Sequence, residues 1–472
     1  MRIAFINPPV TREERYGSLA AAGSYAPPLA LCSLAAVTRR AGYETIIVDA
    51  PVEGLNHERT LRRIEDHKAD IVGITSVTST FRSAARLAQM IKESSPGSTV
   101  VAGGVHVSAL TEKVLTETPG IDVAVIGEGE ETILELLAAL KNKQPLEKVG
   151  GIAFRDGGGI VETAPRPLIR DLDTLPFPAW DMLPNFPSAY NVQAQSVAHS
   201  PSTSVCSSRG CTGRCTFCDR RIFGRDLRAN SVGYVISMIK QLRDQFGIRC
   251  IQFEDDNLMV FRKRLFEFCD EMQKNKINMT WSCQARVDMV MPDSLQRMKE
   301  AGCWMILYGV ESGSQRILDL MGKGITIPKI ERAIELTHRA GIECKGFFIT
   351  GFLGEDEQSL RETYEFVKRC KLDDISNHYY CPFPGSDAFA RAPEYGKIVG
   401  DYMDMTYYRP VFIPEGLTAE DLIRHTKACY RCFYLRPRVI LSYLKRARSF
   451  SDFAIYAKGA AALLRHIVSK RG

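Results

Sequence analysis

Short apolar runs and amphipathic stretches alternate along the first 140 residues of the chain. The run Arg2–Pro8 (RIAFINP) predicts a buried strand, because consecutive apolar residues fill its centre without a helical period. The stretches Leu29–Glu44 and Phe81–Ser94 predict helices, since their apolar residues recur every three to four positions. Further strands are expected at Thr45–Ala50, Asp70–Ser76, Ser98–Gly104 and Asp122–Glu130. This alternation predicts an α/β domain with a Rossmann-like parallel sheet.

A second alternation of strands and helices covers residues 203–384. Its six expected strands lie within 203–208, 248–256, 279–286, 305–311, 343–352 and 375–384. A closed TIM barrel needs eight strand–helix units, so six units predict a partial (β/α)6 barrel. The predicted fold class is therefore α/β, with a Rossmann-like first domain, a partial TIM barrel and a helical C-terminal tail.

Composition sets the expected domain boundaries. Pro, Gly and Asp become frequent after residue 140, most clearly in Asp171–Pro184 (DLDTLPFPAWDMLP), which predicts a linker over 141–203. The first domain is thus expected at 1–140, the barrel at 204–385 and a mostly helical region at 386–472.

The overall composition is that of an ordinary globular protein, with 45% hydrophobic and 25% charged residues in a chain of 472. The formal net charge of +6 is mild, so no nucleic-acid partner is expected. The start of the sequence lacks a signal-peptide pattern, and no apolar run reaches the roughly 20 residues needed to cross a bilayer. These features predict a cytoplasmic protein.

Three of the 14 cysteines are crowded into one short stretch, SSRGCTGRCTFCDR. Cys211, Cys215 and Cys218 follow the spacing Cys-x3-Cys-x2-Cys. A structural zinc site takes four protein ligands, so these thiols form one only with a distant fourth ligand. The alternative is a four-iron cluster held by three thiolates, whose fourth iron stays open for a small molecule. Gly210 and Gly213 supply the backbone freedom for such a loop.

The loop resembles the cluster loop of the radical S-adenosylmethionine (SAM) superfamily, which also has an aromatic residue, here Phe217, before its third cysteine. The resemblance implies a 4Fe-4S cluster on Cys211, Cys215 and Cys218, with SAM bound at the open iron and cleaved to a 5′-deoxyadenosyl radical. It also implies an external electron donor such as flavodoxin or ferredoxin. Cys206 fits the spacing less well and is interpreted as a buried strand residue.

Polar residues follow the later strands of the second region, where this superfamily places its SAM contacts. In the stretch 253–257 (FEDDN), Glu254, Asp255 and Asp256 suit the SAM ammonium, and Arg286 suits its carboxylate. Gly351 and Gly354 are expected near adenine. For each polar residue, a helix cap or salt bridge is an equally favoured alternative. The full set of expected SAM contacts is Phe217, Asp255, Gln284, Arg286, Glu311 and Ser312.

Three loops of the first domain combine glycines and hydroxyls at the expected carboxyl ends of strands, within GITSVTST, AGGVHVS and IGEGEET. Glycines permit the close approach of a bulky, flat ligand, and hydroxyls satisfy a long polar tail. No Gly-x-Gly-x-x-Gly follows the first strand, so a dinucleotide is less favoured. The candidate ligand contacts are Ser76, Thr78, Gly103, Gly104, His106, Gly127, Glu128 and Gly129.

These loops resemble the cobalamin-binding domain of class B radical SAM methyltransferases and of the anaerobic Mg-protoporphyrin monomethyl ester cyclase. The resemblance spans nearly the whole chain and implies cobalamin as a further cofactor. The Asp-x-His-x-x-Gly loop of other cobalamin enzymes is missing, so the cobalt is not expected to bind through that histidine. His106 is interpreted either as a neighbour of the corrin or as a structural histidine. A domain that has lost its ligand and serves only packing is the alternative.

The resemblance predicts a cobalamin-dependent radical SAM enzyme, with C-methylation of an unactivated carbon as the preferred reaction. The alternative is an oxidative cyclase or rearrangement enzyme acting on a porphyrinoid, lipid or secondary metabolite. A non-catalytic cobalamin or metal sensor is the interpretation from another functional class. No catalytic side chain is assigned, and the partner is expected to be a small-molecule substrate.

The C-terminal tail from Arg436 to Gly472 is basic, with Asp452 as its single acid. Apolar residues at helical spacing favour a helix packed on the barrel with a solvated basic face. The alternative is a helix that lies on an anionic membrane, or that receives a lipophilic substrate. Cys429 and Cys432 form an isolated pair, which is weak grounds for a second metal site.

Overall fold

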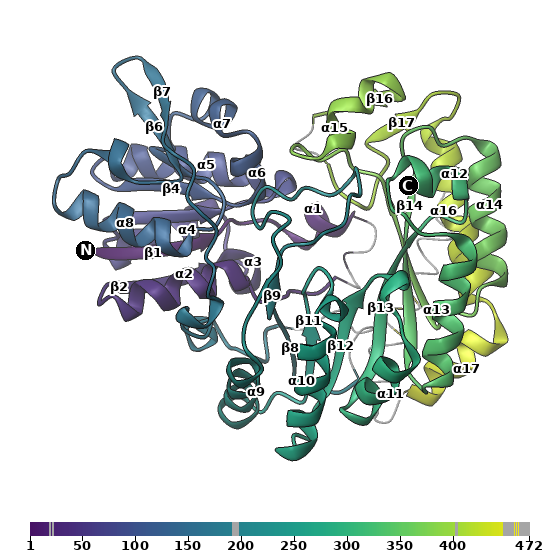
Figure 1. The fold of residues 1–472 in the computed structure, drawn as a ribbon. Coiled ribbons are helices and arrows are strands. Elements are labelled where there is room, and N and C mark those ends of the chain that lie inside the picture. The colour runs from purple at the N-terminus through teal and green to yellow at the C-terminus, as the bar shows by residue number, and fades with distance from the viewer. Residues whose placement is uncertain are drawn as a thin grey trace.

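The computed structural model describes residues 1–17, 20, 23–190, 198–401 and 405–446, together with residues 457, 459 and 461 of the tail. Two α/β domains lie side by side, the first purple to blue and the second teal to green, with the last described helices on the outer side of the second (Figure 1). The α/β class and the order of its parts are as the sequence predicts.

The first domain contains a seven-stranded sheet in the order β2-β1-β3-β4-β5-β6-β7. Five strands are parallel: β1 Arg2–Asn7, β2 Glu44–Asp49, β3 Ile71–Thr75, β4 Thr99–Gly103 and β5 Val123–Val125. The helices between and around them are α1 Arg12–Tyr16, α2 Leu29–Arg40, α3 Ala50–Glu53, α4 His57–His67, α5 Phe81–Ser94, α6 Val105–Ala109, α7 Thr111–Glu117 and α8 Glu130–Lys141.

Both faces of this sheet are covered, because successive side chains of a strand point to opposite faces. Ile3 and Phe5 of β1 pack in one hydrophobic cluster, and Ala4 and Ile6 pack in another. Burial on both faces explains why the strands read as continuous apolar runs in the sequence.

The sheet continues into the range that the sequence analysis took as a linker. Strands β6 (Ile152–Asp156) and β7 (Gly159–Glu162) form an antiparallel hairpin, and β6 pairs with β5. Gly157 and Gly158 have φ values of +54° and +117° in the turn of this hairpin. The strands are short and their turn is rich in glycine, so the hairpin resembles a loop in sequence.

The second domain is a curled sheet of six parallel strands in chain order, as the prediction of a partial barrel requires. The strands are β8 Ser202–Val205, β11 Cys250–Phe253, β12 Thr280–Ala285, β13 Cys303–Glu311, β14 Glu343–Thr350 and β15 Asp374–Tyr379. The helices that accompany them are α9 Val232–Phe246, α10 Arg262–Lys274, α11 Pro292–Glu300, α12 Gln315–Leu320, α13 Ile327–Arg339 and α14 Glu357–Arg369.

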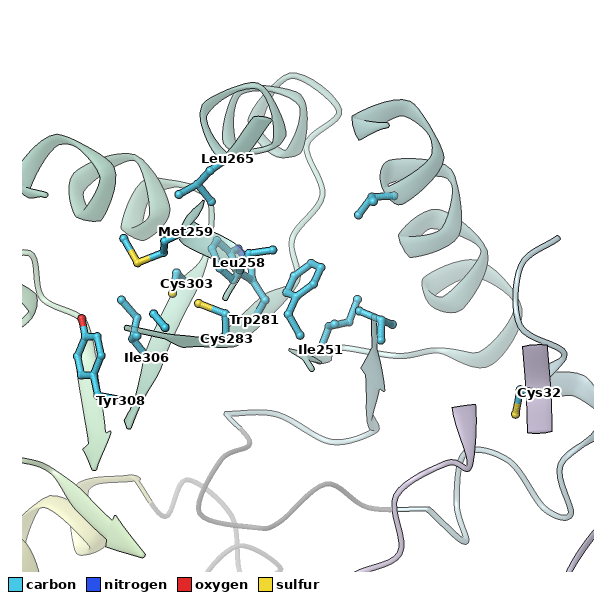
Figure 2. Packing of buried hydrophobic residues seen from close by; sticks show 14 of the residues in the cluster. Cys32, Ile251, Leu258, Met259, Leu265, Trp281, Cys283, Cys303, Ile306 and Tyr308 are labelled. Carbon is cyan, nitrogen blue, oxygen red and sulfur yellow. The ribbon is translucent and has the colours of Figure 1, made fainter. Parts of the chain in front are cut away.

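Aromatic and sulfur-containing side chains fill the space between this sheet and its helices (Figure 2). The Trp281 ring lies edge-on to Phe253 at 5.7 Å and to Phe268 at 5.5 Å. Cys283 and Cys303 are fully buried beside it, as small hydrophobic residues. This layer fixes the strands whose carboxyl ends hold the candidate site.

A short antiparallel pair, β9 (Ser208–Arg209) and β10 (Arg228–Ala229), follows β8 and lies at the junction of the two domains (Figure 1). We call residues 208–229 the cluster hairpin, because its loop contains Cys211, Cys215 and Cys218.

The C-terminal region begins with α15 Asp387–Arg391 and the antiparallel strands β16 Gly396–Ile398 and β17 Phe412–Pro414. Helix α16 (Ala419–Tyr434) packs on α14 and β15, and α17 (Pro437–Arg446) follows it. Most of the basic tail that the sequence analysis singled out lies outside the described residues. Within the described part, no helix combines the length and apolar character that crossing a membrane demands.

Candidate functional site

The cluster hairpin is a rigidly held loop. Gly210 has φ +89°, and a Cβ there would lie 2.3 Å from the Asp226 carbonyl oxygen, so only glycine fits. The Thr216 N–H donates to the Met321 carbonyl at 2.9 Å, which ties the loop to the end of α12. The Arg220 guanidinium donates to the carbonyls of Gly213 and Cys215, each at 3.1 Å. These bonds fix the backbone that carries the three thiols.

The three thiols share one short loop but are not gathered closely enough to bind a single ion together. The Gly213 N–H donates to Cys211 Sγ at 3.4 Å, and a Cβ on Gly213 would lie 3.9 Å from Cys215 Sγ. The three Sγ atoms do not all lie within 4.8 Å of one another in this part of the described chain. Two thiolates on one zinc, each about 2.3 Å from it, are at most about 4.6 Å apart. The donor set therefore fits a larger cluster better than zinc.

Cys218 is the most exposed of the three as a whole residue, but neighbouring protein atoms still shield its sulfur from water. This desolvation, together with Asp256 and the two other cysteines, raises the pKa of Cys218 to about 11. Iron must displace this proton when it binds.

Arg286, at the end of β12, is held directly beside the thiols. Its Nη1 lies 3.8 Å from Cys215 Sγ. Two bonds to the Asp288 carboxylate, at 3.0 and 2.9 Å, and one to the Lys323 carbonyl at 2.8 Å fix the guanidinium plane. The Nε and Nη2 donors are thus taken by Asp288 and Lys323, and Nη1 is the donor that faces the thiols and suits one bond to a carboxylate there.

Glu311 and Lys323 form a buried pair on the same side of the loop. Glu311 Oε1 lies 2.6 Å from Lys323 Nζ, and each side chain is 9% exposed. Lys323 Nζ also lies 5.7 Å from the centre of the Phe217 ring. Glu311 has φ +65°, which costs a non-glycine residue about 1–2 kcal/mol. The structure thus gathers Phe217, Arg286 and Glu311 near the thiols and adds Lys323, which the sequence analysis did not name.

Gln284 lies on the inner face of the barrel, where it binds Glu254. The Gln284 amide donates to Glu254 Oε2 at 2.9 Å, and the Gln252 amide donates to Oε1 at 2.7 Å. Burial raises the pKa of Glu254. Of the three acids in FEDDN, Glu254 therefore shares the barrel face with Gln284.

Asp255 and Ser312 are not brought to the thiols. Asp255 is fully buried, and it accepts bonds from the Ser207 N–H at 3.1 Å, from the Ser207 hydroxyl at 2.8 Å and from the Ser208 hydroxyl. Ser312 bonds Thr363 at 3.0 Å and is also fully buried. Because side chains alternate along a strand, Asp255 points away from the face that Glu254 occupies. Both residues hold loops in place.

Glu355 is a buried carboxylate that the sequence analysis did not name. It accepts bonds from the N–H groups of Gly351 and Phe352, the latter at 3.2 Å, and so shapes the loop expected near adenine. Burial raises the pKa of Glu355 to about 7.

This raised pKa predicts a pH-dependent stability. The folded protein holds one more proton than the unfolded chain between about pH 4.5 and 7, so the contribution of Glu355 is full below this window and is lost as pH rises through 7. Urea unfolding measures the free energy of unfolding of the wild type and of Glu355→Gln. Between about pH 4 and 8, the wild type should lose on the order of 3 kcal/mol relative to the variant. A difference independent of pH would contradict the assignment.

The first-domain candidates line the carboxyl edge of the parallel strands. Thr78 Oγ1 lies 3.2 Å from His106 Nδ1, and the His106 ring stacks on Phe81 at 4.3 Å. His106 is 1% exposed, and burial lowers its pKa to about 4. The imidazole is therefore neutral and packed inside the domain.

The same edge offers a close backbone approach and an apolar surface. Gly104 has φ +106°, and a Cβ there would lie 2.5 Å from the Ser76 carbonyl oxygen. The buried Ser76 hydroxyl has no hydrogen-bond partner among the described residues. Val77, in the loop after β3, is 50% exposed, and Val105, the first residue of α6, is 40% exposed. Glycine backbone, exposed valines and an orphaned hydroxyl fit a flat macrocycle with a polar tail.

Glu128 has a different position from its neighbours Gly127 and Gly129. Its carboxylate accepts two bonds from Arg228 at 2.8 and 2.9 Å, one from Arg209 at 2.7 Å, and one from the Ile169 N–H at 2.9 Å. Arg209 also binds Glu130 at 2.5 Å. Arg209 and Arg228 are the two arginines of β9 and β10. Glu128 therefore ties the first domain to the cluster hairpin.

The remaining cysteine candidates do not assemble a metal site. Neither Cys429 nor Cys432 belongs to a group of three ligand atoms within 4.8 Å in the described chain. Such a group does exist at His338, Cys344 and Asp373, but Asp373 already accepts bonds from the Cys344 N–H at 2.9 Å and from Arg438 at 3.2 Å.

Two family profiles match the chain, the B12 binding domain over residues 17–137 and the Radical SAM superfamily over residues 205–367. An uncharacterized methyltransferase of Pyrococcus horikoshii is 32% identical over 89% of this chain and 90% of its own length. The anaerobic magnesium-protoporphyrin IX monomethyl ester cyclase of Rubrivivax gelatinosus is 30% identical over 94% of this chain and 79% of its own length.

A solved structure shares the fold of the whole chain. The cobalamin-dependent SAM radical enzyme OxsB with aqua-cobalamin superimposes with a TM-score of 0.74, covering 99% of this chain and 72% of that one, at 17% identity.

Proposed function

The chain belongs to the radical SAM superfamily and carries a B12 binding domain, and from this premise we propose that it is a cobalamin-dependent C-methyltransferase that acts on an unactivated carbon. The observation that carries the proposal is the cluster hairpin with its three thiols, joined by buried ion pairs to the glycine-rich edge of the B12 binding domain. The cofactors of this family are a 4Fe-4S cluster, SAM and cobalamin.

When bound, the cluster and SAM supply a 5′-deoxyadenosyl radical, and the cobalamin supplies the methyl group. Cys211, Cys215 and Cys218 hold the cluster in this proposal, and Arg286 orients the SAM carboxylate. Glu254 accepts from the SAM ammonium in place of the expected Asp255. The Glu311–Lys323 pair and Phe217 wall this pocket and help keep water from the radical.

At the first domain, Gly103 and Gly104 allow the macrocycle to approach the backbone in this proposal. Val77 and Val105 would offer it an apolar surface, and the Ser76 hydroxyl would bind its polar tail. His106 holds the Thr78 loop and does not ligate the cobalt, because its imidazole is already packed on Phe81 and bound to Thr78.

An oxidative cyclase is the second candidate, because the R. gelatinosus cyclase is similar over most of both chains. The mass of the product separates the two functions, since methylation adds one CH2 and ring closure does not. We propose a small-molecule substrate, an external one-electron donor and a cytoplasmic location.

The test is anaerobic reconstitution with iron, sulfide, cobalamin and SAM carrying a labelled methyl group, with titanium(III) citrate as reductant. The expected results are a four-iron cluster, formation of 5′-deoxyadenosine, transfer of label to the cobalamin, and corrin that stays with the protein through gel filtration. Gly104→Val is expected to lose corrin while keeping its iron, because its side chain would meet the Ser76 carbonyl. Purification with zinc in place of the cluster would overturn the proposal.

A further inference from the structure

The cluster hairpin has more arginines than its fold uses. Residues 208–229 contain six arginines and two aspartates, a local balance of +4. The tail from residue 436 onward has nine Lys and Arg and one Asp, so the first 435 residues of this +6 chain sum to −2. The hairpin is thus a positive segment on an otherwise slightly acidic body.

Three of the six arginines are structural. Arg209 and Arg228 bind Glu128, and their side chains are 13% and 3% exposed. Arg220 binds the Gly213 and Cys215 carbonyls inside the loop. These three hold the hairpin in shape and are not offered to a partner.

The other three, Arg214, Arg221 and Arg225, are exposed, and none of them forms an ion pair with a described residue. Of the two acids of the hairpin, Asp226 pairs with Arg170 at 3.1 Å, and Asp219 accepts from the backbone N–H of Arg221 at 3.0 Å without an ion pair to its guanidinium. Arg214 directly precedes Cys215, and Arg221 follows Cys218 by three positions. Any partner that binds these guanidinium groups is therefore held against the loop that carries the thiols.

We propose that Arg214, Arg221 and Arg225 form the docking surface for an acidic one-electron carrier protein. The proposal rests on the proposed function, because a redox-active cluster on this loop needs an electron from outside. The carrier loses one electron and the oxidised cluster gains it, with no proton or bond exchanged. Three positive charges next to the acceptor both attract an acidic partner and orient it.

The test compares two reductants on the reconstituted protein. Stopped-flow absorbance follows bleaching of the cluster by reduced flavodoxin, which is an acidic carrier, and separately by dithionite. The triple variant Arg214→Glu, Arg221→Glu, Arg225→Glu should be reduced by flavodoxin about 10-fold or more slowly at low salt, and should lose much less of its rate with dithionite, a small anion that needs no docking surface. The matched control is Arg62→Glu, an exposed arginine of α4, which should behave as the wild type with both reductants. Added salt should slow the flavodoxin reaction of proteins that keep the three arginines more than it slows their dithionite reaction.

A wild-type flavodoxin rate in the triple variant, with its iron content intact, would overturn the proposal. Should the triple variant hold no iron, the rates of reduction are compared for the single Arg→Gln variants. Calorimetry of oxidised flavodoxin with the iron-free protein gives a second readout, the binding affinity. In that titration the triple variant should bind at least about 10-fold more weakly than the wild type. A wild type that forms no cluster would instead contradict the proposed function, so the two failures are distinct.

Discussion

Glu128→Ala is expected to lower the free energy of unfolding by about 3–5 kcal/mol, because it leaves the buried Arg228 guanidinium without its carboxylate and leaves Arg209 with Glu130 alone. The Glu128 and Arg228 side chains are each 3% exposed, so water cannot replace the lost bonds without opening the junction. Urea unfolding followed by circular dichroism measures the change. Glu128→Gln keeps an acceptor for one arginine and should lose less.

Glu131→Ala is the matched control, since Glu131 lies three positions further along the chain, on α8, and is 52% exposed. Its 3.9 Å contact with Arg166 is a surface ion pair, worth about 0–1 kcal/mol. A loss below about 1 kcal/mol for Glu128→Ala would show that water or rearranged side chains satisfy Arg209 and Arg228. The same result would contradict the inference that Glu128 links the B12 binding domain to the cluster hairpin.

The elements of both sheets could be predicted from periodicity, because strands buried on two faces leave continuous apolar runs and helices leave a three-to-four-residue repeat. The β6–β7 hairpin could not, since its strands are short and its turn is rich in glycine. The local pattern of apolar residues reflects how a segment is buried. A short, half-exposed hairpin therefore leaves little periodicity in the sequence.

The candidate site was predictable where one loop contains the chemistry and less so where distant segments meet. The spacing of Cys211, Cys215 and Cys218 is local, and so it is visible in the sequence. The arginine partners of Glu128 lie 81 and 100 positions away in the sequence. No local pattern therefore shows that its carboxylate binds arginines and does not face the candidate ligand edge of the first domain. The position of Asp255 just after a strand suggests a ligand contact. The direction of its side chain depends on the alternation of side chains between the two faces of the strand, which places Glu254 on the inner face.

Lys323 and Glu355 illustrate signals that the sequence does contain. Lys323 stands between Gly322 and Gly324, which have φ values of +61° and +67°. A lysine between two glycines in a loop indicates a tight turn that fixes where the side chain points. Glu355 directly follows Gly354, and its carboxylate caps backbone N–H groups of the same short loop. In both cases a charged residue stands next to glycine in a loop, after α12 for Lys323 and after β14 for Glu355, and tertiary packing then buries the charge.

Cys215→Ala is expected to abolish both the 4Fe-4S cluster and 5′-deoxyadenosine formation, whereas Cys206→Ala is expected to keep both. Cys215 lies inside the cluster loop, with its sulfur 3.8 Å from Arg286 Nη1. The Cys206 thiol instead donates to the Ser208 carbonyl at 3.0 Å, and burial raises its pKa. Cys206 precedes the cluster loop and its thiol is already bound to the Ser208 carbonyl, so it is not placed among the three loop thiols.

The two cysteines are a matched pair. Cys206 lies just before the cluster hairpin and Cys215 lies inside it, and each loses only a sulfur on substitution by alanine. Iron and sulfide content, the electron paramagnetic resonance spectrum of the reduced protein and chromatography of the nucleoside product measure the outcome. Loss of the cluster in Cys206→Ala would mean that four thiolates close the site and leave no iron open for SAM. Retention of a complete cluster in Cys215→Ala would place the iron elsewhere. Either result would remove the basis for radical chemistry on this hairpin, since that chemistry requires three protein ligands and one vacant iron.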